Sequence, residues 1–357
     1  MKKTLLAIAL LQVPVFAFAQ SSLTLYGILD AGITYVNNQQ GKSVVMSDSG
    51  ILQGNRWGLL GKEDLGGGLK AVFNLESGFN LSNGAMGQGG LLFGRTAYVG
   101  LDSDKAGVLT FGRQYDFMTD FMVENSAAAN GTTAVAFHLF DADRLAGEQL
   151  NNTVKYVSPT WGGVSFGALY GFSNVAGGFA GTDAAPRASS FGLKFAQGPL
   201  VVSAAYTAVT GMTGSLATIT LRGHSQRVWA VGGRYRFDKL KVFGNATSTL
   251  VRATAAGHNA TINNYEVGAT YFVTPAATLT GGYTYSTYAS HGYNQLNTTA
   301  HYFLSKETDV YLAVNYQHTN NQAMGAGMFL DTTPGTLIGY SSTENQVGVR
   351  IGLRKKF

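Results

Sequence analysis

Residues of alternating character recur along nearly the whole chain, and this period of two constrains the fold more than any other feature. The final segment is an example, because its apolar residues are Val347, Val349, Ile351, Leu353 and Phe357, while most positions between them are glycine or basic. Side chains of a strand point alternately to opposite faces, so this segment predicts one apolar and one positively charged face. An aromatic residue at its end is typical of the interfacial girdle of an outer-membrane barrel. An edge strand of a soluble sandwich is the alternative.

The same alternation predicts about sixteen strands. Their connections alternate between very short and mostly long, as periplasmic turns and external loops do in bacterial barrels. The expected fold is therefore all-β, a 16-stranded antiparallel transmembrane β-barrel with both termini on the periplasmic side. The predicted strands are 22–36, 51–62, 68–80, 91–102, 107–115, 151–158, 163–172, 189–196, 199–208, 226–237, 240–250, 263–273, 277–288, 293–304, 309–318 and 344–357.

The first residues and the composition agree with an exported barrel. A basic start, an apolar run to Phe18 and a small-x-small site before Gln20 predict a cleaved signal peptide over 1–19, followed by the barrel over 20–357. No later apolar run reaches the length of a spanning helix. Charged residues make up only 13% of the chain, which is low for a soluble protein. The net charge of +5 is too small and too evenly spread to predict nucleic-acid binding.

One predicted connection, between Tyr115 and Asn151, is too long for a simple surface turn. Long loops without strong secondary structure are usually functional or disordered. This one combines the apolar piece 134–140 with several acids, so we expect it to fold into the pore of its own barrel; a mobile external loop is the alternative. The acids predicted to line the pore are Asp116, Asp120, Glu124, Asp141, Asp143 and Glu148.

Basic residues predicted on the lumen face of the wall lie opposite these acids. If Trp57 points outward then Arg56 points inward, and if Tyr98 points outward then Arg95 points inward. The same parity turns Lys155 inward, whereas the side of Arg113 stays ambiguous. Arginine or lysine facing lipid at mid-membrane would cost about 2–4 kcal/mol, which favours the lumen. Charged rings select solutes in pores, so we predict a weak preference for small anions. The alternative is that these side chains are solvated charges of the lumen that have little effect on ion selectivity.

Other motifs give little reason to expect chemistry. Gly163–Gly167 reads G-x-S-x-G, but it lies inside an alternating strand with no helix after it, unlike a hydrolase elbow. The histidines lack metal-ligand spacing, and glycines 66–68 lack the lysine and helix of a phosphate loop. We therefore expect no enzyme activity, no metal and no cofactor. A barrel enzyme, a plugged transporter and a soluble adhesin are the competing classes.

Several segments together resemble the general bacterial porins of the Gram-negative outer membrane, particularly the betaproteobacterial branch with Burkholderia, Bordetella and Comamonas. They are SLTLYGILDAG (22–32), NRWGL (55–59), EDLGGGLKA (63–71), FGRTAYVGL (93–101), FGRQ (111–114), NTVKYVSP (152–159) and GLRKKF (352–357). Lys355 departs from the histidine usual in the family, and Lys155 from the arginine of some relatives.

The resemblance implies a homotrimer of barrels, each a water-filled diffusion pore for small hydrophilic solutes and ions that is narrowed by its third loop. It implies as partners outer-membrane lipid, lipopolysaccharide and the barrel-assembly machinery, which would read a signal that includes Phe357.

Overall fold

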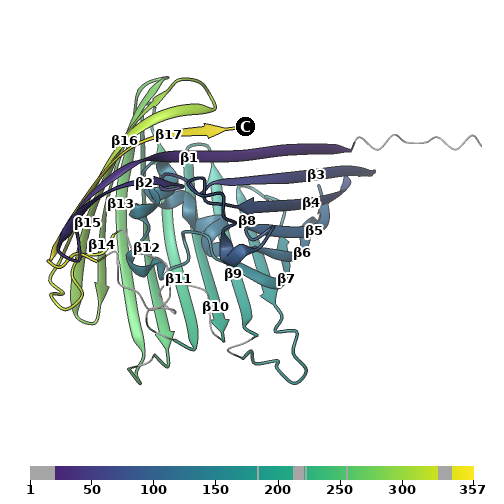
Figure 1. Cartoon of the computed structure of the whole chain (residues 1–357). Coiled ribbons are helices and arrows are strands. Elements are labelled where there is room, and N and C mark those ends of the chain that lie inside the picture. Colours follow the sequence, from purple (N-terminus) through teal and green to yellow (C-terminus); the bar gives the residue numbers. More distant parts are fainter. Residues whose placement is uncertain (1–20, 183–184, 212–220, 222, 255, 329–339) are drawn as a thin grey trace, which may run out of the picture.

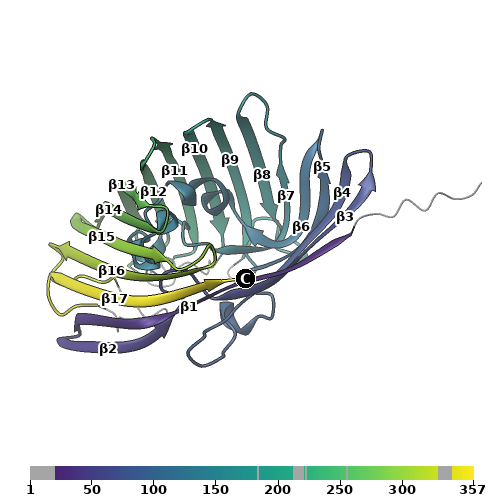
Figure 2. The same ribbon diagram turned by 90° about the horizontal axis from the view of Figure 1, so that it is seen from above.

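The computed structural model describes residues 21–182, 185–211, 221, 223–254, 256–328 and 340–357. The strands form one antiparallel sheet whose first strand pairs with its last, so the sheet is a closed barrel (Figure 1). Figure 2 shows the ring of strands from above, with short helices of the β6–β7 connection inside it. The predicted signal peptide, 1–19, lies outside the described residues.

The strands are β1 (Ser22–Gln39), β2 (Lys42–Ser49), β3 (Arg56–Gly66), β4 (Leu69–Gly78), β5 (Thr96–Ser103), β6 (Gly107–Tyr115), β7 (Gln149–Val157), β8 (Val164–Gly171), β9 (Arg187–Gln197), β10 (Leu200–Thr210), β11 (Ser225–Arg236), β12 (Leu240–Arg252), β13 (Ala260–Thr274), β14 (Ala277–Tyr288), β15 (His291–Phe303), β16 (Thr308–Thr319) and β17 (Asn345–Lys356). The short helices are η1 (Gln88–Gly90), η2 (Met118–Met122), η3 (Val123–Asn125), η4 (Ala128–Asn130), η5 (Ala134–Ala136) and η6 (Leu139–Asp141).

The barrel has sixteen positions in its wall, because β2 and β3 share one of them. β3 pairs with the first part of β1, from Ser22 to Ile28, and β2 pairs with its second part, from Ala31 to Gln39. The predicted strand 51–62 is therefore wrong in its first residues. Residues 50–55 leave the wall because Asp30 holds them: its carboxylate accepts the Leu52 N–H at 2.7 Å, and its own N–H donates to the Asn55 side chain at 2.6 Å.

The two faces of the wall differ as the alternation predicts. Outward positions carry exposed apolar and aromatic side chains, including Leu25, Val99, Phe191, Trp229, Val267, Leu312 and Ile351. Inward positions carry buried polar groups, including Asp30, Thr34, Glu76, Asn245, Glu266, Asn297 and Arg350. Such a wall suits lipid outside and polar groups inside. Among the described residues, no helix is long and apolar enough to cross a membrane.

The connection from β6 to β7, residues 116–148, contacts the inner face of the opposite wall. Its Asn125 amide donates to Ser203 of β10 at 2.7 Å, and its Gly131 carbonyl lies 2.7 Å from the ring of His301 on β15. Phe117 of this connection belongs to a cluster of buried apolar side chains that the connection and the wall share. A Cβ added at Gly167 of β8 would lie 2.1 Å from the Phe117 ring. The wall glycine therefore makes room for the aromatic side chain.

The chain's last residue closes the seam of the barrel. Phe357 and Gly27 of β1 exchange both backbone hydrogen bonds, at 2.9 and 3.1 Å. The Phe357 ring covers Gly27 so closely that an added Cβ would lie 2.3 Å from it.

Deleting Phe357 should therefore lower the yield of folded barrel more than it changes conductance. The loss of two hydrogen bonds and a half-buried ring costs on the order of 2–4 kcal/mol. The measurement is the heat-modifiable fraction on a denaturing gel of outer-membrane protein. Phe357→Tyr keeps the ring and the pairing, so it should assemble normally; unchanged assembly of the deletion with altered conductance would contradict this role.

Candidate functional site

A central cavity of about 830 Å³ lies between the 116–148 connection and the wall. Its lining includes the segment 50–54 that leaves the wall, the loop residues 128–135, and side chains from β12 to β17. Its arginine and lysine side chains are Arg56, Arg95, Lys241, Arg354 and Lys356, and its one carboxylate is that of Asp141; His138 also lines it.

Arg56 and Arg95 share one carboxylate. Arg95 Nε lies 2.5 Å from Glu76 Oε1, whereas the Arg56 guanidinium lies 4.0 Å from the same oxygen and donates through Nε to the Gly54 carbonyl at 2.9 Å. The Tyr26 hydroxyl donates to the other oxygen of Glu76 at 2.9 Å. Because two guanidinium groups face one acid, the group keeps a net positive charge beside the cavity.

The Arg95 side chain points into the lumen, as predicted, but the prediction used an outward Tyr98, and this premise does not hold. Val99 is exposed on the outer face of β5, while Thr96 is buried and donates to Asn74, so Tyr98 lies on the inner face. The outward assignment of Tyr98 was wrong. Arg95 precedes the first residue of β5, so strand parity does not fix its direction, and its bond to Glu76 does.

Several of the predicted acids pair with wall cations. Asp120 forms an ion pair with Lys155, whose ammonium also donates to the Tyr115 carbonyl at 2.8 Å. Glu124 lies 3.2 Å from Lys194 and 2.7 Å from Arg234. Lys155 is inward-facing, as predicted, but it is buried in this pair and does not line the central cavity.

The remaining acids are held within the loop. Arg144 binds both Asp116 and Glu148, each at 2.5 Å. Asp143 lies 2.5 Å from His138 and accepts the Thr247 hydroxyl at 2.7 Å. Of the six acids, Asp141 is the one that lines the central cavity, where its carboxylate accepts the Ala146 N–H at 3.1 Å.

His138 anchors the loop to β13. Its second ring nitrogen lies 3.3 Å from Glu266, which also accepts the Ala127 N–H at 2.8 Å and the Asn245 amide at 2.6 Å. Burial opposes a charged ring, but Asp143 and Glu266 raise the pKa of His138 to about 10. The imidazolium is therefore charged at neutral pH and links two buried carboxylates.

A second cavity of about 660 Å³, the outer cavity, meets the central one at Arg95, Ala146 and Gly147. Arg113 and Glu148 line it at the long-loop end of β7. The pairing of β6 with β7 shifts between Gly112 and Gln114, and Arg113 at this irregularity donates to the Gly94 carbonyl at 2.8 Å and to Asn151 at 2.5 Å.

Among the described residues, Lys356, Asp309 and Asp48 are charged groups of the lumen that sequence reasoning missed. Lys356 lines the central cavity and has the same parity as Arg354, so alternation could have found it. Asp309 binds Arg354 at 2.9 Å and begins a predicted strand. Asp48 pairs with Arg350, but it belongs to β2, which the sequence pattern did not predict.

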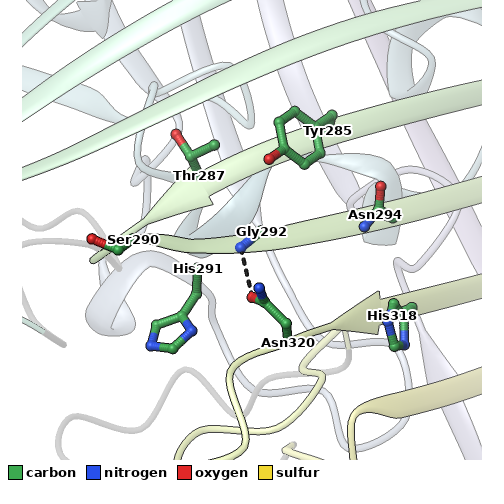
Figure 3. A pocket seen from close by; sticks show the side chains of 8 residues that line it. All are labelled: Tyr285, Thr287, Ser290, His291, Gly292, Asn294, His318 and Asn320. Atoms are coloured by element: carbon green, nitrogen blue, oxygen red, sulfur yellow. Dashed lines mark hydrogen bonds between the residues drawn. The ribbon is translucent and has the colours of Figure 1, made fainter.

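A third depression, of about 400 Å³, lies at the loop ends of β14 to β16 and is separate from the lumen. Tyr285, Asn294 and His318 line it, and the Gly292 N–H donates to Asn320 at 2.9 Å (Figure 3). No group of three or more metal-ligating side chains occurs in the described part of the chain. Ser165 of the G-x-S-x-G motif lies within β8, as predicted.

A closed antiparallel barrel with a polar, charged lumen defines the class of outer-membrane channels. The sequence pattern of the Gram-negative porins matches residues 4–322, and the chain belongs to that family. It is thus a β-barrel protein of the bacterial outer membrane, in a family of channels rather than enzymes.

Individual relatives agree with this assignment. The chain is 36% identical over 268 residues to an outer membrane porin of Bordetella pertussis, covering 68% of each protein. It is 29% identical to outer membrane porin protein 32 of Delftia acidovorans over the whole of both chains.

Two solved structures share the fold. An anion-selective porin from Comamonas acidovorans has a TM-score of 0.78 at 24% identity, covering 95% of this chain and 100% of that one. An outer membrane protein of Vibrio cholerae in its trimer form has a TM-score of 0.63 at 15% identity, covering 94% and 99%.

Proposed function

We propose that the protein is a passive diffusion channel for small hydrophilic solutes with a weak preference for anions. The observation that carries this proposal is the lining of the central cavity, where five arginine and lysine side chains face one carboxylate. Fixed charge of one sign in a narrow aqueous passage raises the local concentration of counter-ions. The porin from Comamonas acidovorans that shares this fold is anion-selective, which supports the same sign.

We further propose that the 116–148 segment sets the narrowest part of the passage. Its hydrogen bonds to β10, β13 and β15, and its share of the cavity lining, support this role. Arg56 and Arg95 would form the basic side of the constriction, whereas Lys155 would act mainly by neutralising Asp120. Asp141 and Glu148 would be the acids that solutes meet.

The assembly partners also belong to this proposal. The trimer form of the Vibrio cholerae protein supports a homotrimer, in outer-membrane lipid and lipopolysaccharide. The seam position of Phe357 supports a role in the signal read by the barrel-assembly machinery.

A planar-bilayer measurement tests the ion preference. In a KCl gradient, the sign of the zero-current potential gives the preferred ion. We expect anion preference that strengthens at low salt, where charges are less screened over the roughly 10 Å Debye length of 0.1 M. Cation preference at every salt concentration would reject the proposal.

The anion preference should grow as the pH falls from about 8.5 to about 5.5. Burial raises the pKa of Glu148 to about 7, with Asp116 adding to the shift and Arg144 opposing it. Burial also raises the pKa of Asp141. Below the pKa of Glu148 its carboxyl is protonated, so the lumen loses negative charge near Arg95. Glu148→Gln should reduce the pH dependence and Glu148→Gln with Asp141→Asn should abolish it; an undiminished dependence in the double variant would assign it to other groups.

A further inference from the structure

Three arginines face outward at the long-loop end of β9 to β12. Arg187 lies on the face of β9 opposite the buried Ala188, Arg227 lies on the face of β11 that carries the exposed Trp229, and Arg252 lies opposite the buried Val251. The four strands are neighbours in the wall (Figure 1). We call Arg187, Arg227 and Arg252 the outer arginine triad.

The strand register brings the triad together. Arg187 pairs with Thr210, Thr210 with Ser225, and Ser225 with Arg252, so these residues form one row across the four strands. Neighbouring strands lie about 4.8 Å apart, which places the ends of the row roughly 14 Å apart. Arg227 lies two residues along β11 from Ser225, on a strand between those of Arg187 and Arg252. Three long side chains at this spacing can reach one ligand that carries several anionic groups.

An aromatic row sets the depth of the triad. Phe191 pairs with Tyr206 and Tyr206 with Trp229, and all three side chains are exposed on the outer face. Outward aromatics of this kind mark the membrane interface of a barrel. Arg227 lies two residues beyond Trp229, toward the long connections 211–224 and 253–259. Long connections are external in bacterial barrels, so the triad lies at the headgroup level of the outer leaflet.

Within the part of the chain that the structure describes, the triad has no protein counter-charge. Among the described residues, none of its members has an ion-pair partner, whereas the lumen arginines Arg144 and Arg350 are paired. Outward positions at the same end of β14 to β16 carry Tyr285, Asn294 and His318 and no arginine or lysine (Figure 3). Of these two parts of the wall, only β9 to β12 carry outward arginines among the described residues.

We propose that the outer arginine triad binds the phosphate groups of lipid A, the membrane anchor of lipopolysaccharide. Family membership places the chain in the outer membrane, whose outer leaflet consists of lipopolysaccharide, and lipid A is a disaccharide that carries two phosphates above its acyl chains. Guanidinium groups bind phosphate with charge-assisted, often bidentate hydrogen bonds. Phe191, Tyr206 and Trp229 lie where the first carbons of the acyl chains would pack. The inference rests on the proposed lipopolysaccharide environment and is independent of the proposed ion preference.

Native mass spectrometry of the purified protein, titrated in detergent with bisphosphorylated lipid A, tests the site. Each basic residue near anionic headgroups contributes about fivefold, so the combined Arg187→Gln, Arg227→Gln and Arg252→Gln variant should bind about 100-fold more weakly. Dephosphorylated lipid A should bind the wild-type protein as weakly as bisphosphorylated lipid A binds the variant. Lys239→Gln removes one charge from the opposite end of the same strands and should leave the affinity unchanged.

Heat modifiability and single-channel conductance of the triple variant establish that its barrel is folded. A folded triple variant that binds bisphosphorylated lipid A within about twofold of wild type would overturn the proposal. Equal wild-type binding of the dephosphorylated lipid would overturn it too, because the acyl chains alone would then account for affinity. A smaller oligomer with unchanged lipid affinity would reassign the triad to a contact between copies of this chain.

Discussion

Replacing Arg56 and Arg95 together by glutamine should remove most of the channel's preference for anions. Five arginine and lysine side chains and one carboxylate line the central cavity, so the double variant halves the excess of arginine and lysine over carboxylate from four to two. It also leaves Glu76, which now lies 2.5 Å from Arg95, without either guanidinium. The local charge beside the passage then changes from positive to negative, which makes the effect larger than the count alone gives.

The measurement is the zero-current potential in a KCl gradient, at high and low salt. Adding Glu76→Gln to the double variant removes the uncompensated acid, so this triple variant should fall between wild type and the double variant. Lys105→Gln takes one positive charge from an exposed turn outside the lumen and should have no effect. If the double variant kept the wild-type potential, Lys241, Arg354 and Lys356 would be the dominant charges.

Replacing Glu266 by alanine should detach the 116–148 segment from the wall and raise both the conductance and its noise. Glu266 accepts the Ala127 N–H and the Asn245 amide, and it faces the charged ring of His138. Removing one member of a buried ionic group costs on the order of 3–5 kcal/mol, because its partners stay buried without compensation. The loop would then sample positions away from β13.

Single-channel recording measures this effect, with Glu266→Gln as the matched variant. Glutamine keeps an acceptor for the Ala127 N–H and loses only the charge, so its conductance should stay closer to wild type. If the Glu266→Ala variant is folded and heat-modifiable and keeps the wild-type conductance, the Glu266 anchor does not determine the width of the constriction.

The fold was predictable because period-two alternation is a local property of each strand. It located nearly every strand and the outward apolar face, but it failed where side chains replace ladder hydrogen bonds. Asp30 binds the backbone of Leu52 and is bound by Asn55, and this exchange divides one wall position between β2 and β3. Nothing in the alternation of residues 50–55 reveals that Asp30 of β1 is their partner.

The candidate site was less predictable, because the net charge at each point of the lumen depends on which side chains form ion pairs with one another. Parity correctly turned Lys155 inward, yet only the three-dimensional arrangement places Asp120 on it. Arg95 lies outside its strand, so the direction inferred from Tyr98 rested on a rule that does not apply there. Arg144 could not be assigned to Asp116 and Glu148 without the path of the loop.

The pairing of Phe357 with Gly27 and of Ile28 with Lys356 also bears on how the barrel forms. Every other neighbouring pair of strands in the wall is close in sequence, so hairpins can form one after another as the chain becomes available. The seam joins β1 to β17, which are far apart in the sequence. Bringing them together costs loop-closure entropy before any contact across the seam can form. Closure is therefore expected to be the late, slow step of folding, and until then β1 and β17 present unpaired edges that need protection from other chains.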